Sequence, residues 1–117
     1  QALSDLCHKA DLSRLSWRRD ERADPELLLQ RQPVQVRFAD IAVVPPAGGF
    51  LQATEEGERA LQDFVTSVLT GQKVKRAADL YAGCGTFTFP LLALGCRVDA
   101  FEGYVPSVTA LTAAGKG

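Results

Sequence analysis

A glycine-rich bend between a predicted strand and a predicted helix constrains the fold of this chain more than any other feature. Residues 76–82 are typical of a buried strand, and residues 86–94 have the spacing of a short helix that ends at Gly95. Gly83 and Gly85 lie between the two segments. Because glycine lacks a Cβ atom, the backbone can turn sharply there and a ligand can lie against it. The bend predicts an α/β fold with a binding site at the end of a strand.

The segments after the bend repeat the order of strand and helix. Residues 97–102 predict a second strand, and Pro106 suits the first turn of a helix that extends to Ala114. A strand–helix alternation with short connections implies parallel strands and right-handed crossovers. We therefore predict the N-terminal part of a Rossmann-like fold.

The segment before the bend predicts a smaller α+β unit. An amphipathic helix is expected over residues 2–15, and a charged stretch then leads to a short edge strand at residues 27–30. Alternating apolar residues over 34–44 predict a β-hairpin.

A domain boundary is predicted at the Pro-Pro-Ala-Gly-Gly sequence of residues 45–49, because prolines cannot donate to a ladder and glycines accept unusual dihedral angles. Residues 1–49 would form a helix-plus-hairpin subdomain, and residues 50–117 the first half of the Rossmann-like domain. Thr54 is a good N-cap for an amphipathic helix that Gly71 would end.

Glu102, at the end of the second strand, lies at the distance where a carboxylate would meet the ribose hydroxyls of an adenosine ligand. A dinucleotide fingerprint would require a third glycine where this chain has Thr88, so the motif argues against NAD or FAD. Two plainer interpretations stay open: Gly83 and Gly85 could form only a tight structural turn, and Glu102 could be only a solvated charge.

Composition excludes some classes of protein. The formal net charge of −1 gives the whole chain no attraction for nucleic acid or an anionic membrane. Three cysteines without a CxxC or Cys/His cluster argue against a metal site or a disulfide framework and favour the cytoplasm. No apolar run is long enough for a membrane span.

Three motifs in register resemble the bacterial RNA uracil-5-methyltransferases, which make 5-methyluridine in ribosomal or transfer RNA. The motifs are Phe50-Leu51-Gln52, then Asp79-Leu80-Tyr81-x-Gly83-x-Gly85-Thr86-Phe87-Thr88-x-Pro90-Leu91, and then Val98-x-x-x-Glu102-Gly103. The resemblance covers roughly residues 34–114. It implies that residues 50–117 are the first half of a methyltransferase domain and that the cofactor is S-adenosyl-L-methionine.

The resemblance also implies roles for single residues. Gln52 and Tyr81 would contact the cofactor, Thr86 would face it, and Glu102 would hold its ribose beside Gly83 and Gly85. From the residues alone, Gln52 could equally be a loop residue and Tyr81 a core aromatic. The chain departs from the family pattern at Ala82, where the family often has cysteine, and at Thr54, where it commonly has asparagine.

No catalytic residue is expected in this chain. The family uses a nucleophilic cysteine and a base whose motifs would lie beyond Gly117, so we expect a fragment that is inactive alone. Cys84 should not take that role, because nothing nearby would lower its pKa. Cys7 and Cys96 are expected to be small buried hydrophobic residues.

RNA is the expected partner of the parent enzyme, and ribosomal RNA is favoured over transfer RNA. Trp17 with Arg18, Arg19 and Arg22 could contact RNA, but the acidic residues among them also fit a solvated face. A non-catalytic nucleotide-binding or interaction module is the alternative function, and an oxidoreductase half-domain is a third. Exposed sheet edges are expected to favour self-association.

Overall fold

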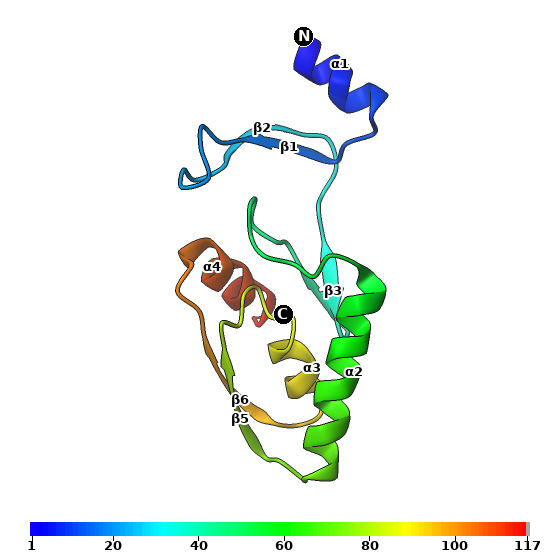
Figure 1. The fold of residues 1–117 in the computed structure, drawn as a ribbon, viewed down its shortest axis with the longest axis vertical. Helices are drawn as coiled ribbons and strands as arrows, with labels where there is room; N and C mark the ends of the chain where they lie inside the picture. Colours follow the sequence, from blue (N-terminus) through cyan, green and yellow to red (C-terminus); the bar gives the residue numbers. More distant parts are fainter. Residues whose placement is uncertain (117) are drawn as a thin grey trace.

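The computed structural model describes residues 1–116 and contains four helices and six strands among them (Figure 1). In chain order these are α1 (Ala2–Lys9), β1 (Arg14–Trp17), β2 (Glu26–Gln30), β3 (Val36–Phe38), β4 (Ile41–Val43), α2 (Glu55–Gly71), β5 (Arg76–Leu80), α3 (Thr88–Ala93), β6 (Arg97–Phe101) and α4 (Val105–Ala114). No helix in this described part is long and apolar enough to cross a membrane.

The N-terminal helix is shorter than predicted. It ends at Lys9, and Asp11 then takes a left-handed backbone with φ of 48°. The chain continues into β1, which pairs antiparallel with β2 from Arg14↔Gln30 to Trp17↔Glu26. The expected helix over residues 10–15 is therefore wrong, because the distant partner strand β2 takes the backbone hydrogen bonds of residues 14–17.

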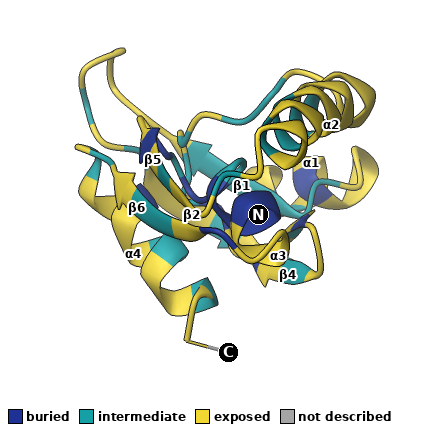
Figure 2. Cartoon of the chain, turned by 90° about the horizontal axis from the view of Figure 1, so that it is seen from below, coloured by how far each residue is buried: buried dark blue, intermediate teal, exposed yellow. Residues whose placement is uncertain are grey.

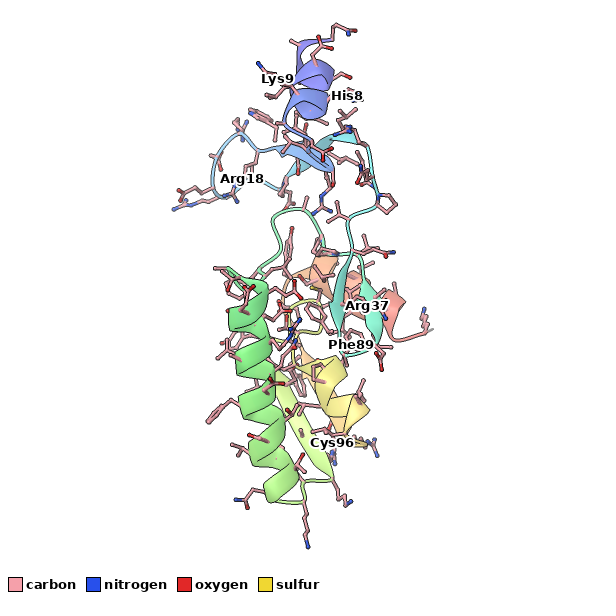
Figure 3. The ribbon with its side chains drawn as sticks, turned by 90° about the vertical axis from the view of Figure 1, so that its right-hand side faces the viewer. His8, Lys9, Arg18, Arg37, Phe89 and Cys96 are labelled. Carbon is pink, nitrogen blue, oxygen red and sulfur yellow. The ribbon has the colours of Figure 1, made fainter. Side chains whose placement is uncertain are left out.

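The predicted hairpin and edge strand are confirmed. β2 covers the expected edge strand, and β3 and β4 pair antiparallel around a turn in which Ala39 has φ of 51°. Phe38 and Val43 of the hairpin are fully buried, and they form one core cluster with Cys84 and Phe89. Figure 3 shows Phe89 between α3 and the hairpin that carries Arg37. The hairpin and the glycine bend thus share a core, while the boundary at residue 49 stays a prediction.

Helix α2 begins where its sequence predicts. The Thr54 hydroxyl accepts a hydrogen bond from the Gly57 N–H at 3.1 Å, which caps the helix, and the helix ends at Gly71. Its residues are exposed or only half-buried along the whole length, and most of the helix is coloured as exposed in Figure 2. Leu61, Phe64 and Val68 form an apolar stripe that faces solvent.

Strands β5 and β6 are parallel, as predicted, with Arg76 opposite Arg97 and Leu80 opposite Phe101. Helix α3 connects them and packs on β6, while α4 packs against β4 of the hairpin. β5 and α3 are each shorter than predicted, because residues 81–87 form a wide bend rather than the end of a strand and the start of a helix. The carboxyl ends of both strands therefore open toward the same edge.

Candidate functional site

The bend after β5 has a strained backbone. Tyr81, Gly83 and Gly85 have positive φ angles of 59°, 58° and 110°. For tyrosine this left-handed conformation costs about 1–2 kcal/mol. Its side chain is 92% exposed, so Tyr81 is not a core aromatic. Such strain is typical of functional sites, where the surrounding structure fixes an unfavourable conformation.

The two glycines of the bend serve different purposes. A Cβ atom on Gly85 would lie 2.4 Å from the Phe89 ring, so only glycine lets the bend pack on the core at this point. A Cβ atom on Gly83 would meet no atom within 4 Å. Gly83 is therefore a glycine beside open space, where its backbone is accessible to a ligand.

Glu102 points at the bend. Its Oε2 accepts a hydrogen bond from the Gly83 N–H at 2.8 Å, and its Oε1 accepts one from the Tyr104 N–H at 2.7 Å. These two bonds lower the pKa of the Glu102 carboxyl, the Tyr104 bond most, so the side chain is ionised at neutral pH. The carboxylate keeps capacity to accept a further hydrogen bond, because a carboxylate accepts about four.

A cleft of about 540 Å³ opens beside Glu102. Leu80 and Tyr81 line it from the end of β5, Ala100, Phe101, Glu102 and Gly103 from the end of β6, and Val108, Leu111 and Thr112 from α4. The cleft combines an apolar wall with one fixed carboxylate, which is the usual character of a small-molecule site.

Two of the predicted site residues lie elsewhere. Gln52 lines a separate hollow of about 380 Å³ together with Arg37 and Glu58. Burial, followed by the charge of Glu55, raises the pKa of the Glu58 carboxyl in this hollow.

Thr86 lies in the bend, outside the Glu102 cleft. Its backbone oxygen accepts a hydrogen bond from the side-chain amide of Gln62 at 2.8 Å, which ties the bend to α2. The structure thus brings Tyr81, Gly83 and Glu102 together, but it does not place Gln52 in their cleft.

Sequence comparison identifies curated relatives of this chain. An uncharacterized RNA methyltransferase of Mesorhizobium japonicum is 40% identical over 88 residues, which cover 75% of this chain and 21% of that protein. An uncharacterized RNA methyltransferase of Caulobacter vibrioides is 44% identical over 84 residues, 72% of this chain and 19% of the relative. The 23S rRNA (uracil(1939)-C(5))-methyltransferase RlmD of Shewanella woodyi is 34% identical over 89 residues, 73% of this chain and 20% of its own length.

The chain is homologous to part of bacterial RNA methyltransferases. The predicted resemblance to the RNA uracil-5-methyltransferases is thereby confirmed. The chain spans about one fifth of the length of these relatives. No protein-family model matches it.

A solved structure shows the same fold. The tRNA (uracil-54, C5)-methyltransferase of Pyrococcus abyssi, crystallised in complex with S-adenosyl-L-homocysteine, aligns with a TM-score of 0.69. The alignment covers 89% of this chain and 27% of the other, at 17% sequence identity. The predicted fold class, the N-terminal part of a Rossmann-like methyltransferase fold, is confirmed.

Cys7, Cys84 and Cys96 are free thiols in buried positions. The prediction that Cys7 and Cys96 are buried is confirmed. Burial also raises the pKa of the Cys84 thiol, and the charge of Glu58 adds to this effect. Cys84 therefore stays protonated at neutral pH and is a poor nucleophile. Residues 1–116 contain no group of three or more possible metal ligands.

A polar pair that the sequence reasoning missed lies at the base of the bend. The Thr88 hydroxyl donates a hydrogen bond of 2.6 Å to Oδ2 of Asp79, and both side chains are buried. The sequence signal for this pair is one polar residue on each side of the glycine motif, each among apolar neighbours.

The charged stretch after β1 forms the loop between β1 and β2. Asp20 stabilises this loop, because its Oδ1 accepts hydrogen bonds from the N–H groups of Arg22 and Ala23. Trp17 is 53% exposed, and Figure 3 shows Arg18 in the loop at the outer side of the molecule. Arg18 and Arg22 also line a hollow of about 250 Å³ together with Tyr104, two residues after Glu102. The arginine-bearing loop is thus a neighbour of the Glu102 cleft.

Proposed function

We propose that this chain is the part of an RNA uracil-5-methyltransferase that binds the adenosyl group of S-adenosyl-L-methionine. The observation that carries the proposal is the Glu102 carboxylate, fixed by backbone N–H groups at the mouth of an apolar cleft. The free lone pairs of this carboxylate suit the two hydroxyls of a ribose, and the apolar wall suits an adenine ring. The open space beside Gly83 leaves room for the part of the cofactor that adjoins the ribose.

The cofactor supplies the methyl group, and this chain's residues supply binding and orientation. Glu102 would hold the ribose, while Gly83 and Tyr81 would border the adjoining part of the ligand. Gln52 would contact the cofactor or the substrate from its separate hollow, and Thr86 from the bend itself. The nucleophile that adds to uracil would come from another segment, since Cys84 is buried and protonated.

The parent enzyme would act on ribosomal RNA in the cytoplasm, and transfer RNA is the second substrate class. Relatives named for both substrates support RNA as the partner. The free thiols fit a reducing compartment. The exposed Trp17 and the arginines of the β1–β2 loop lie where RNA could reach the cleft. Methyl transfer by the parent enzyme into separated 23S ribosomal RNA and transfer RNA would distinguish the two substrates.

Calorimetry with S-adenosylhomocysteine tests the cofactor site directly. We expect the chain to bind S-adenosylhomocysteine more tightly than NAD. Glu102→Gln should weaken S-adenosylhomocysteine binding by about 1–3 kcal/mol, because it removes charge-assisted hydrogen bonds to the ribose. Glu56→Gln, an exposed change on α2, is the matched control and should leave the affinity unchanged. Tighter binding of NAD, or equal affinities for Glu102→Gln and the unmodified chain, would contradict the proposal.

A further inference from the structure

The base of the glycine bend is closed by two buried side chains. Asp79 lies near the end of β5 and is 8% exposed, and Thr88 is the first residue of α3 and is 4% exposed. The 2.6 Å hydrogen bond between them joins β5 to α3 on the two sides of the bend formed by residues 81–87. Neither side chain lines the Glu102 cleft.

This hydrogen bond matters more than a surface bond would. Within the described residues, the Thr88 hydroxyl is the one side-chain donor that reaches the Asp79 carboxyl, and no lysine or arginine lies within ion-pair distance of it. A buried carboxyl that loses its donor bears the full penalty of desolvation. The bend therefore strongly favours the conformation in which Asp79 and Thr88 meet.

The same conformation fixes the tip of the bend. The Ala82 N–H donates to the Phe101 oxygen at 3.0 Å, and the Gly85 N–H donates to the Ala82 oxygen at 3.0 Å. Between these two contacts, the Gly83 N–H reaches Glu102. A shift of α3 away from β5 would move this short segment, because Gly85 rests on the Phe89 ring of α3.

We propose that Thr88 is a positioning residue, whose hydrogen bond to Asp79 holds the bend so that the Gly83 N–H orients Glu102 toward the cleft. Thr88 does not touch the ligand in this proposal. It acts through the backbone of the bend on the orientation of the Glu102 carboxylate. The consequence for cofactor affinity rests on the proposed function, whereas the effect on Glu102 itself does not.

The test compares Thr88→Val, which removes the hydroxyl at nearly constant volume, with Thr88→Ser, which restores it. Thr66→Val is the matched control, because the Thr66 hydroxyl bonds only to backbone oxygens within α2. The first readout needs no ligand: NMR titration of the Glu102 carboxyl. We expect Thr88→Val to move the pKa of Glu102 upward, toward its ordinary value, and Thr88→Ser and Thr66→Val to leave it in place.

The second readout is the affinity for S-adenosylhomocysteine. We expect Thr88→Val to lose about tenfold, the effect of one lost buried hydrogen bond, and Thr88→Ser to stay within about twofold of the unmodified chain. If the unmodified chain binds no S-adenosylhomocysteine, the proposed function fails, and the Glu102 titration still decides the positioning role. An unchanged Glu102 pKa in Thr88→Val would overturn that role.

A double variant separates positioning from stability. Thr88→Val alone leaves Asp79 without its donor and can unfold the chain, but Asp79→Leu combined with Thr88→Val leaves no unpaired polar group and should fold. We expect the folded double variant to show the same upward shift of the Glu102 pKa. If the double variant keeps the original Glu102 pKa, packing alone positions the bend and the proposal is wrong.

Discussion

At the scale of single residues, the site depends on backbone conformations that few side chains permit. Gly85 has both a positive φ and a core aromatic ring in the place of its missing Cβ, whereas Gly83 has a positive φ beside open space. The two glycines of one motif are thus required for different reasons. Gly85 lets the bend pack against Phe89, and Gly83 leaves open space beside the bend.

We predict that Gly85→Ala lowers the free energy of unfolding by about 2–4 kcal/mol, because backbone strain and overpacking against Phe89 add. Gly71→Ala is the control: no atom lies within 4 Å of its added Cβ, and alanine favours the helix. Urea unfolding monitored by circular dichroism measures both. A Gly85→Ala variant as stable as Gly71→Ala would show that the bend does not rest on the core.

The pKa values of two carboxyls, Glu102 and Glu58, are shifted in opposite directions. Backbone hydrogen bonds lower the pKa of Glu102, so its contribution to stability is complete above the unfolded-state value of about 4.3 and is lost as the pH falls through the lower folded value. Burial raises the pKa of Glu58, so its contribution is complete below the unfolded-state value and is lost as the pH rises through the higher folded value. NMR titration of both carboxyls in one sample checks the signs. A Glu102 midpoint above that of Glu58 would contradict the described hydrogen bonds.

At the scale of elements, local signals predicted most of the fold. Thr54 and Gly71 mark the ends of α2, and the alternation over residues 34–44 marks the hairpin. β1 could not be predicted locally, because its partner β2 begins nine residues after β1 ends and the apolar spacing of residues 3–12 also suits a helix.

The candidate site was likewise predictable only in part, because some of its contacts follow from a local motif and others depend on packing. Gly83 and Glu102 belong to a sequence motif, and the parallel register of β5 and β6 brings them together. The Asp79–Thr88 bond depends on how α3 is seated on the sheet, which no local pattern encodes. The position of Gln52 likewise depends on how the hairpin packs against α2.

The cap of α2 gives a prediction for an element. Thr54→Ala should destabilise the chain by about 1 kcal/mol, because the Gly57 N–H loses its side-chain acceptor. Thr70→Ala, at an exposed position in the last turn of the same helix, should be neutral or slightly stabilising. Thermal unfolding of the two variants measures the difference, and equal melting temperatures would refute the cap.

At the scale of the whole molecule, the chain is slender and exposes much apolar surface. Its extents are 55 × 26 × 26 Å and its radius of gyration is 16.3 Å, whereas a compact domain of 100 residues has about 13 Å. The outward stripe of α2 includes Phe64, which is 67% exposed. Exposed apolar stripes and free strand edges both promote association.

We predict that the isolated chain self-associates and that Phe64→Glu weakens the association severalfold by placing a charge in the apolar stripe. Ser67→Glu adds the same charge at an exposed polar position of α2 and should have a smaller effect. Sedimentation equilibrium over a range of concentrations measures the change. A monomeric unmodified chain at high concentration would contradict the prediction.

The β1–β2 hairpin contacts a short stretch of backbone that follows β4. The Arg14 guanidinium donates to the Pro45 oxygen at 2.8 Å, and Pro25 lies so close to Gly48 that an added Cβ would be 2.7 Å from its ring. Both contacts from the β1–β2 hairpin thus fall within residues 45–48. Residues 45–48 therefore help to fix where the arginine-bearing loop stands relative to the Glu102 cleft.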